Sequence, residues 1–174
     1  MRILIPGGSG FIGSSIAVFL KKKIKNCDIL SIDNLSRKTS LFNIKKLNEH
    51  NIKNIKLDLS SKKAFSQIKK KFDFIIDCCA EPAVEAAKFN RSLVFDSNLR
   101  STLNILEKAK KDNSKIIYLS TSRVYSIEKI NNIFQNIKFK SKLQKKITIN
   151  EKFSTDSPIS LYGFSKLSSE MLIR

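Results

Sequence analysis

The 174-residue sequence contains few of the residues that build specialised sites, with no tryptophan, one histidine, three cysteines and five glycines. Cys27, Cys78 and Cys79 lack C-x-x-C spacing, and the single His50 cannot complete a zinc site with them. We therefore expect no metal centre, and reduced thiols in a cytoplasmic protein. The sequence also lacks the ~20 consecutive apolar residues of a membrane span, and we expect no signal peptide before its first apolar run.

Acidic residues are scarce as well, because 33 lysines and arginines stand against 15 aspartates and glutamates, for a net charge of +18. Such a charge is compatible with nucleic-acid binding. However, the lysines are spread over the polar faces of most expected helices. The sequence also shows no aromatic-basic motif, helix-turn-helix pattern or zinc-finger spacing. Specific nucleic-acid binding is therefore a remote alternative, and solvated helix faces explain the charge better.

Four of the five glycines lie in one turn near the start of the chain. An apolar run at 3–5 predicts a buried strand, and Gly7, Gly10 and Gly13 follow at three-residue spacing before a helical pattern. The first glycine permits a tight turn, the second lets backbone approach a pyrophosphate, and the third lets helix pack on strand. Free N–H groups at the helix start, including those of Phe11 and Ile12, would bind the phosphates.

Asp33 ends a second apolar run at 28–33, twenty residues after Gly13. A carboxylate at this position hydrogen-bonds the adenosine ribose hydroxyls of a dinucleotide and repels a 2′-phosphate, which favours NAD over NADP. Arg37 and Lys38 keep NADP open, because a nearby arginine is the usual partner of a 2′-phosphate. Asn34 follows Asp33 in the same loop and is predicted to line the same site.

Apolar runs continue to alternate with helical patterns, which predicts an α/β protein. We expect one domain over residues 1–174 with a Rossmann-like, doubly wound parallel sheet of about five strands in the order 3-2-1-4-5. A surface excursion is expected at about 126–155, with room for a short helix. The expected strands are 3–5, 28–33, 52–57, 72–79 and 115–120, and the expected helices are 11–25, 41–49, 61–71 and 95–107.

Tyr162 and Lys166 form a second motif, four residues apart. On a helix their side chains project from one face, about one turn apart. A tyrosine is a poor base at neutral pH because a phenol ionises near pH ~10, but a neighbouring ammonium favours the phenolate. Gly163, the last glycine, directly follows the tyrosine. The pair therefore predicts proton-transfer chemistry.

Together these motifs resemble the extended branch of the short-chain dehydrogenase/reductases, the NAD-dependent epimerase/dehydratase family. The matching segments are GGSGFIG, DNLS after the second strand, TSRVY after the fifth and PISLYGFSK. The resemblance implies NAD as cofactor, a nucleotide-sugar as substrate, and catalytic roles for Thr121, Tyr162 and Lys166. It also assigns cofactor contacts to Tyr162 and Lys166, and adds to the cofactor site the residues Asp58, Leu59, Ala80 and Asn98. A loop-start or helix-cap role explains Asp58 equally well. Asn98 could hold the active-site water or a backbone network, or could be an ordinary helix-surface residue.

The chain departs from the resembled family in two respects. Ser122 and Arg123 stand where the dehydratases of the family carry the Asp and Glu that eliminate water. This difference argues against 4,6-dehydration and for epimerisation or simple redox chemistry, and TSRVYS is most similar to CDP-paratose 2-epimerase-like members. The sequence also stops at Arg174, whereas the family continues into a C-terminal substrate domain.

The sequence therefore predicts an NAD-dependent nucleotide-sugar epimerase that is truncated before its substrate domain, with weak or no activity alone. A non-catalytic NAD-binding or partner-binding module is the alternative. Besides the nucleotide-sugar, the expected partners are a second polypeptide that supplies the missing domain, or a second copy of this chain in a homodimer.

Overall fold

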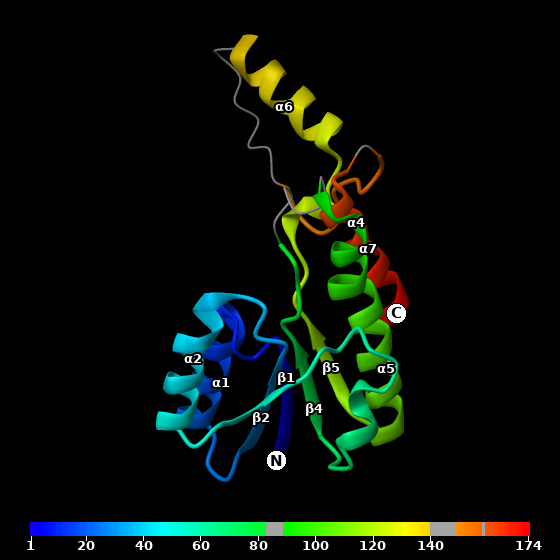
Figure 1. Cartoon of the computed structure of the whole chain (residues 1–174). Coiled ribbons are helices and arrows are strands. Elements are labelled where there is room, and N and C mark those ends of the chain that lie inside the picture. Colours follow the sequence, from blue (N-terminus) through cyan, green and yellow to red (C-terminus); the bar gives the residue numbers. More distant parts are fainter. Residues whose placement is uncertain (83–88, 140–148, 158) are drawn as a thin grey trace.

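The computed structural model describes residues 1–82, 89–139, 149–157 and 159–174. Five strands form one sheet in the order β3-β2-β1-β4-β5, and every pairing is parallel (Figure 1). The predicted doubly wound, Rossmann-like sheet and its strand order are confirmed. The strands are β1 (Arg2–Pro6), β2 (Asp28–Asp33), β3 (Lys53–Lys56), β4 (Phe74–Asp77) and β5 (Lys115–Tyr118).

Helices cover both faces of the sheet, with α1 and α2 on one side and α5 and α7 on the other (Figure 1). The α-helices are α1 (Phe11–Lys23), α2 (Lys38–Glu49), α4 (Arg91–Phe95), α5 (Ser101–Asp112), α6 (Ile127–Phe139) and α7 (Leu161–Ile173). Two 3-10 turns, η1 (Ala64–Gln67) and η3 (Ser122–Val124), and a π-helical turn, η2 (Asp96–Arg100), complete the described elements.

The hydrophobic core has two layers because side chains of β1 alternate between the faces of the sheet. Ile3 and Ile5 pack on one side with residues of α1 and α2, whereas Leu4 packs on the other side with residues of α5 and η1. All three side chains are almost fully buried. The first strand is apolar from Ile3 onward because both of its faces are covered there.

The helix predicted over 61–71 is wrong, since only η1 is helical in this segment. Here the chain must pass from β3 at the edge of the sheet, across β2 and β1, to β4. Extended backbone covers about twice the distance per residue that a helix covers, so most of the crossing is not helical. Ala64 and Ile68 still reach the core, as their helical spacing indicated.

The single helix predicted over 95–107 is in fact α4, η2 and α5 in succession. A π-helical turn adds a residue to the helix and rotates the side chains that follow it. Asn98 lies in this turn and is buried with only 1% of its surface exposed. Hydrophobic spacing alone did not reveal the change, because the apolar residues on either side keep a helical pattern.

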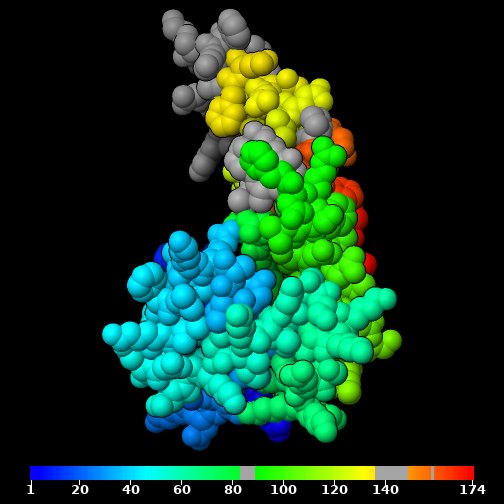
Figure 2. All heavy atoms as spheres, in the orientation of Figure 1, coloured from blue at the N-terminus to red at the C-terminus, as the bar shows by residue number. Residues whose placement is uncertain are grey.

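The excursion predicted at 126–155 contains the 13-residue helix α6, which stands off the main body (Figure 2). Residues 140–148 of this excursion lie outside the described residues. Within the part of the chain that the structure describes, no helix is long and apolar enough to cross a membrane.

Candidate functional site

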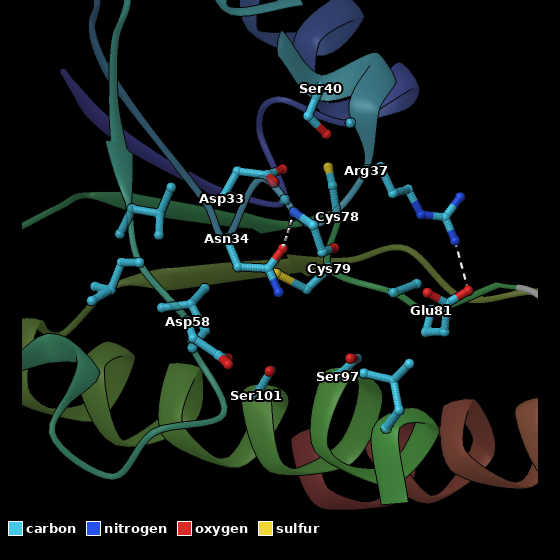
Figure 3. Close-up of a pocket in the computed structure, with 18 residues that line it drawn as sticks. Asp33, Asn34, Arg37, Ser40, Asp58, Cys78, Cys79, Glu81, Ser97 and Ser101 are labelled. Atoms are coloured by element: carbon cyan, nitrogen blue, oxygen red, sulfur yellow. Dashed lines mark hydrogen bonds and ion pairs between the residues drawn. The ribbon is translucent and has the colours of Figure 1, made fainter. Parts of the chain in front are cut away.

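A cavity of about 290 Å³ opens at the carboxyl ends of β1, β2 and β4. Parallel sheets bind ligands at this edge, where the strand order reverses between β1 and β4. The cavity lies between the segment that leads into α2 and the segment of α4 and η2 (Figures 2 and 3). Its lining includes seven predicted site residues, namely Gly7, Gly10, Asp33, Asn34, Asp58, Leu59 and Ala80.

The glycine turn fits its surroundings so closely that three of its four glycines, Gly7, Gly8 and Gly13, have no room for a side chain. Gly7 has a φ of +69°, and a Cβ there would lie 2.6 Å from the Cys78 carbonyl oxygen. A Cβ on Gly13 would lie 2.3 Å from the Gly7 carbonyl oxygen. Gly10 lines the cavity, and a Cβ there would meet only the Gly7 oxygen at 3.1 Å. The first and third glycines therefore shape the turn, and the second faces the cavity.

Helix α1 begins at this turn with unsatisfied backbone donors. Gly10 is its N-cap, no side chain caps it, and its first turn contains no acidic residue. The first N–H groups of a helix have no intrahelical acceptor and carry partial positive charge. The side chains of Phe11 and Ile12 are 84% and 55% exposed and do not line the cavity. Only the backbone N–H groups of these two residues can therefore bind a phosphate, which is the role predicted from the sequence.

The carboxylate of Asp33 is fixed by two backbone donors. Its Oδ2 accepts a hydrogen bond from the N–H of Ser9 at 3.2 Å, and its Oδ1 accepts one from the N–H of Leu35 at 2.8 Å. The first bond ties the end of β2 to the glycine turn. Asn34 also lines the cavity, and its Oδ1 accepts a hydrogen bond from the N–H of Ser36 at 3.0 Å.

Asp58 and Leu59 follow β3 and line the cavity. Asp58 caps its own loop, because its Oδ1 accepts hydrogen bonds from both the N–H and the hydroxyl of Ser60. Leu59 is 4% exposed and belongs to the core layer that contains Leu4. Both explanations offered for Asp58, a loop cap and a position in the site, are therefore compatible with its geometry.

Asn98 lies behind the cavity and not in its lining. Its Oδ1 accepts a hydrogen bond from the N–H of Glu81 at 2.7 Å, and its Nδ2 donates one to the hydroxyl of Ser165 at 2.9 Å. It thereby joins the loop after β4 to helix α7. Asn98 can act on a ligand through the position of Ala80 and Glu81, which corresponds to the backbone-network role that the sequence left open.

Tyr162 and Thr121 come from segments that pack directly on each other. Ser160 is the N-cap of helix α7, and its hydroxyl accepts a hydrogen bond from the N–H of Gly163 at 3.0 Å. A Cβ on Gly163 would lie 2.1 Å from the carbonyl oxygen of Arg123. The glycine after Tyr162 therefore allows α7 to touch the turn η3, which Thr121 caps by accepting from the N–H of Arg123 at 3.3 Å.

Lys166 is buried on the same helix, with 2% of its surface exposed. Its Nζ lies 4.0 Å from the centre of the Tyr118 ring. Burial lowers the pKa of Lys166, and the negative charge of Asp77 opposes this effect. Neither Lys166 nor the 8%-exposed Tyr162 lines the described cavity, so the two motifs of the sequence occupy adjoining regions and not one open pocket.

Asp77 is a buried acid that the sequence analysis did not single out. It ends β4 with 1% of its surface exposed and accepts hydrogen bonds from the N–H of Cys79 and the hydroxyl of Thr102. Burial raises the pKa of its carboxyl to about 6, and the nearby Lys166 partly opposes the rise. The available signal was an aspartate at the end of the apolar run FDFIID.

The vicinal cysteines Cys78 and Cys79, which follow β4, both line the cavity. Burial raises the pKa of Cys78 to about 12 and that of Cys79 well above its ordinary value. The raised pKa values favour the neutral thiols over the thiolates. Burial therefore disfavours reaction at both groups, because the thiolate is the nucleophilic form. Both residues therefore serve as small packing groups at the end of the strand, as buried cysteines commonly do.

The whole chain matches one family of known proteins. A model of the family described as "NAD dependent epimerase/dehydratase family" matches residues 3–174. The chain is 32% identical to the dTDP-D-glucose 4,6-dehydratase of Dictyostelium discoideum over 99% of its own length and 39% of that protein. It is 33% identical to the CDP-paratose 2-epimerase of Salmonella typhi over 72% of its length and 38% of that protein. The chain thus spans less than half the length of these relatives.

Solved structures agree with this assignment. The UDP-Glc/GlcNAc 4-epimerase of Campylobacter jejuni superposes with a TM-score of 0.78 at 28% identity, over 99% of this chain and 48% of that one. The UDP-glucose 4-epimerase of Bifidobacterium longum, solved with NAD⁺ and UDP, gives a TM-score of 0.76 at 26% identity over 100% and 48%. The chain belongs to the NAD-dependent epimerase/dehydratase family.

Proposed function

We propose that this chain is the cofactor-binding and catalytic part of an NAD-dependent nucleotide-sugar epimerase. The observation that carries the proposal is the glycine turn joined to Asp33 through the N–H of Ser9 at the edge of the cavity. The close packing of the Tyr162 helix on the Thr121 turn supports it. Relatives named as epimerases and dehydratases of nucleotide-sugars favour this substrate class.

The residues around the cavity fit a dinucleotide. The uncapped start of α1 and the open side of Gly10 offer backbone N–H groups to a pyrophosphate. Asp33, held in place by two backbone donors, would accept hydrogen bonds from the adenosine ribose hydroxyls. Asp58 and Leu59 would lie against the adenine, and Ala80 would cover the nicotinamide ribose. A fixed carboxylate at the ribose repels a 2′-phosphate, so we propose NAD as the cofactor.

The chemistry that NAD⁺ supplies when bound is the reversible acceptance of a hydride from a sugar carbon. Tyr162 would take the proton of the sugar hydroxyl as that carbon is oxidised. Lys166 would hold the Tyr162 oxygen and the nicotinamide ribose, and the hydroxyl of Thr121 would hydrogen-bond the reacting oxygen. Tyr162 would give this proton back to the sugar oxygen when the carbonyl is reduced again, and reduction from the other face would invert the carbon.

We favour epimerisation over dehydration because of two residues in η3. Ser122 and Arg123 are exposed and occupy the positions at which the resembled dehydratases carry an acidic pair. Neither side chain can supply the carboxyl groups that remove water from the sugar. The CDP-paratose 2-epimerase therefore suggests the reaction type better than the dTDP-D-glucose 4,6-dehydratase.

Turnover is proposed to need a substrate-binding part beyond these 174 residues. This chain covers 48% of each of the two 4-epimerase structures. The surfaces that bind the substrate would lie in a further part of the same protein or in a second polypeptide, and a homodimer is a further proposal. A non-catalytic NAD-binding module is the second candidate function, favoured by the burial of Lys166 against Tyr118.

Calorimetric titration with NAD⁺ and a turnover assay together test this proposal. The chain would be combined with the C-terminal part of a close relative and offered UDP-, CDP- and dTDP-sugars. Tyr162→Phe should abolish epimerisation. The matched control, Tyr125→Phe, should retain it, because the edge-on contact with Phe153 at 5.6 Å needs only the ring. NAD⁺ binding without any turnover of the combined protein would favour the non-catalytic module, and no NAD⁺ binding would refute the proposal.

A further inference from the structure

An ion pair joins the two loops on either side of the cavity (Figure 3). Arg37, the residue before α2, places its Nη2 2.6 Å from the Oε1 of Glu81 in the loop after β4. Both residues line the cavity. The Arg37 side chain is 48% exposed, whereas that of Glu81 is 16% exposed. The pair thus connects segments 44 residues apart in the sequence across the candidate cofactor site.

Glu81 is the anchored member of this pair. Its N–H donates to the Oδ1 of Asn98 at 2.7 Å, and Asn98 is itself buried and hydrogen-bonded to Ser165 of α7. The backbone of Glu81 is therefore tied to the buried interior, while Arg37 reaches it with a long side chain from an exposed loop. The position of the guanidinium consequently depends on the carboxylate of Glu81.

The charges around the cavity make this dependence important. Among the described residues that line it, Arg37 is the one basic side chain, beside the acids Asp33, Asp58 and Glu81. A 2′-phosphate on the adenosine ribose would meet Asp33 and would need a guanidinium to offset the repulsion. Arg37 lies four residues after Asp33, in the loop where a guanidinium could contact a 2′-phosphate. Its charge, however, is already paired with Glu81.

We propose that Glu81 is a specificity-determining residue, which withholds Arg37 from a 2′-phosphate and thereby excludes NADP. This inference rests on the proposed use of the cavity for the adenosine half of a dinucleotide. NADP is excluded by two effects. Asp33 repels the 2′-phosphate, and Glu81 pairs with Arg37, the cation that would otherwise bind this phosphate. Removal of Glu81 alone should therefore admit a 2′-phosphate in part, even with Asp33 in place.

The test compares the affinities of 5′-AMP and adenosine 2′,5′-bisphosphate by calorimetry at low ionic strength. Glu81→Gln should raise the ratio of bisphosphate to AMP affinity about fivefold, since a partly exposed ion pair is exchanged for a phosphate contact. Adding Arg37→Gln to this variant should return the ratio to the original value. The matched control, Lys38→Gln in the Glu81→Gln background, changes a neighbouring exposed cation and should keep the gain.

Two single variants guard against misfolding as an explanation. Arg37→Gln alone should leave the ratio of the original chain unchanged, because its guanidinium is already withheld, and Glu81→Asp should also keep that ratio. An unchanged ratio in Glu81→Gln, or a gain that survives Arg37→Gln, would overturn the role of Glu81. Binding of NAD⁺ with such a result would leave the proposed function standing, whereas failure of the original chain to bind AMP and NAD⁺ would remove both.

Discussion

At the scale of single residues, Asp77 is the acid that the fold buries most completely at the candidate site. Its surroundings raise the pKa of the carboxyl from 3.8 to about 6, mainly because burial disfavours the charged form. The folded protein therefore binds this proton more tightly than the unfolded chain does. The resulting stabilisation is present below the ordinary pKa and is lost as the pH rises through about 6.

We predict that the Asp77→Asn variant does not lose stability from this group as the pH rises through about 6. Between pH 4 and pH 7 the original chain should lose up to about 3 kcal/mol of unfolding free energy from this group, and the variant should not. Urea unfolding at a series of pH values measures the difference. Asp96→Asn, which changes an acid that is 40% exposed on η2, is the control and should follow the original curve. Parallel curves for Asp77→Asn and the original chain would show that the buried carboxyl is not the cause.

A second residue-level prediction concerns Asp33. The unmodified chain should bind NAD⁺ more tightly than NADP⁺, and Asp33→Ala should lower NAD⁺ affinity about tenfold while narrowing the gap between the cofactors. Calorimetry gives both affinities. Asp28→Ala changes an acid at the opposite end of the same strand and should leave both unchanged. Tighter binding of NADP⁺ by the unmodified chain would overturn the assignment of the cofactor.

At the scale of elements, the contact between α7 and η3 depends on Gly163. A Cβ there would lie 2.1 Å from the Arg123 carbonyl oxygen, so Gly163→Ala should destabilise the fold by about 1–3 kcal/mol through overpacking. Helix propensity alone predicts the opposite sign, a gain of about 1 kcal/mol. Chemical denaturation distinguishes the two. Ser168→Ala in the same helix is the control and should be neutral or slightly stabilising, and a stabilising Gly163→Ala would contradict the close contact.

The π-helical turn η2 is the element that links the two halves of the site. It carries Asn98 into the interior, where the side chain contacts both the loop after β4 and helix α7. In a regular helix the residues after this point would face a different direction. The turn therefore sets the position of Glu81 and, through it, that of Arg37.

At the scale of the whole molecule, we predict that the 174-residue chain alone has little or no epimerase turnover. Positioning of a substrate can supply about 7–11 kcal/mol of the rate enhancement, and the surfaces that hold the sugar are proposed to lie beyond this chain. NAD⁺ affinity should suffer less, because the glycine turn and Asp33 are present. Robust epimerisation by the chain alone, abolished by Tyr162→Phe, would show this prediction to be wrong.

The net charge of +18 leads to a prediction about nucleic acid. If the charge only solvates the surface, DNA binding should be weak, indifferent to sequence and lost at moderate salt. Fluorescence anisotropy with two unrelated duplexes at low and physiological salt measures this. A nanomolar complex with one duplex at physiological salt would support the nucleic-acid alternative.

Much of the fold could be predicted from the sequence because its signals are local. The glycine turn, the apolar β1 and the acid Asp33 at the end of β2 lie within short segments whose chemistry leaves few alternatives. The parallel order of the strands follows from this first unit. The same local logic located Tyr162 and Lys166 on one helix, which the structure contains as α7.

Only the tertiary structure decided the contacts between distant segments. Sequence spacing does not relate the residues that meet in these contacts. They are the ion pair of Arg37 with Glu81, the buried Asp77 near Lys166, and Asn98 in the interior. The crossing from β3 to β4 likewise proved too long for the predicted helix. Local patterns determine which element forms, whereas packing determines which side chains meet, because burial and electrostatic energies depend on neighbours from the whole chain.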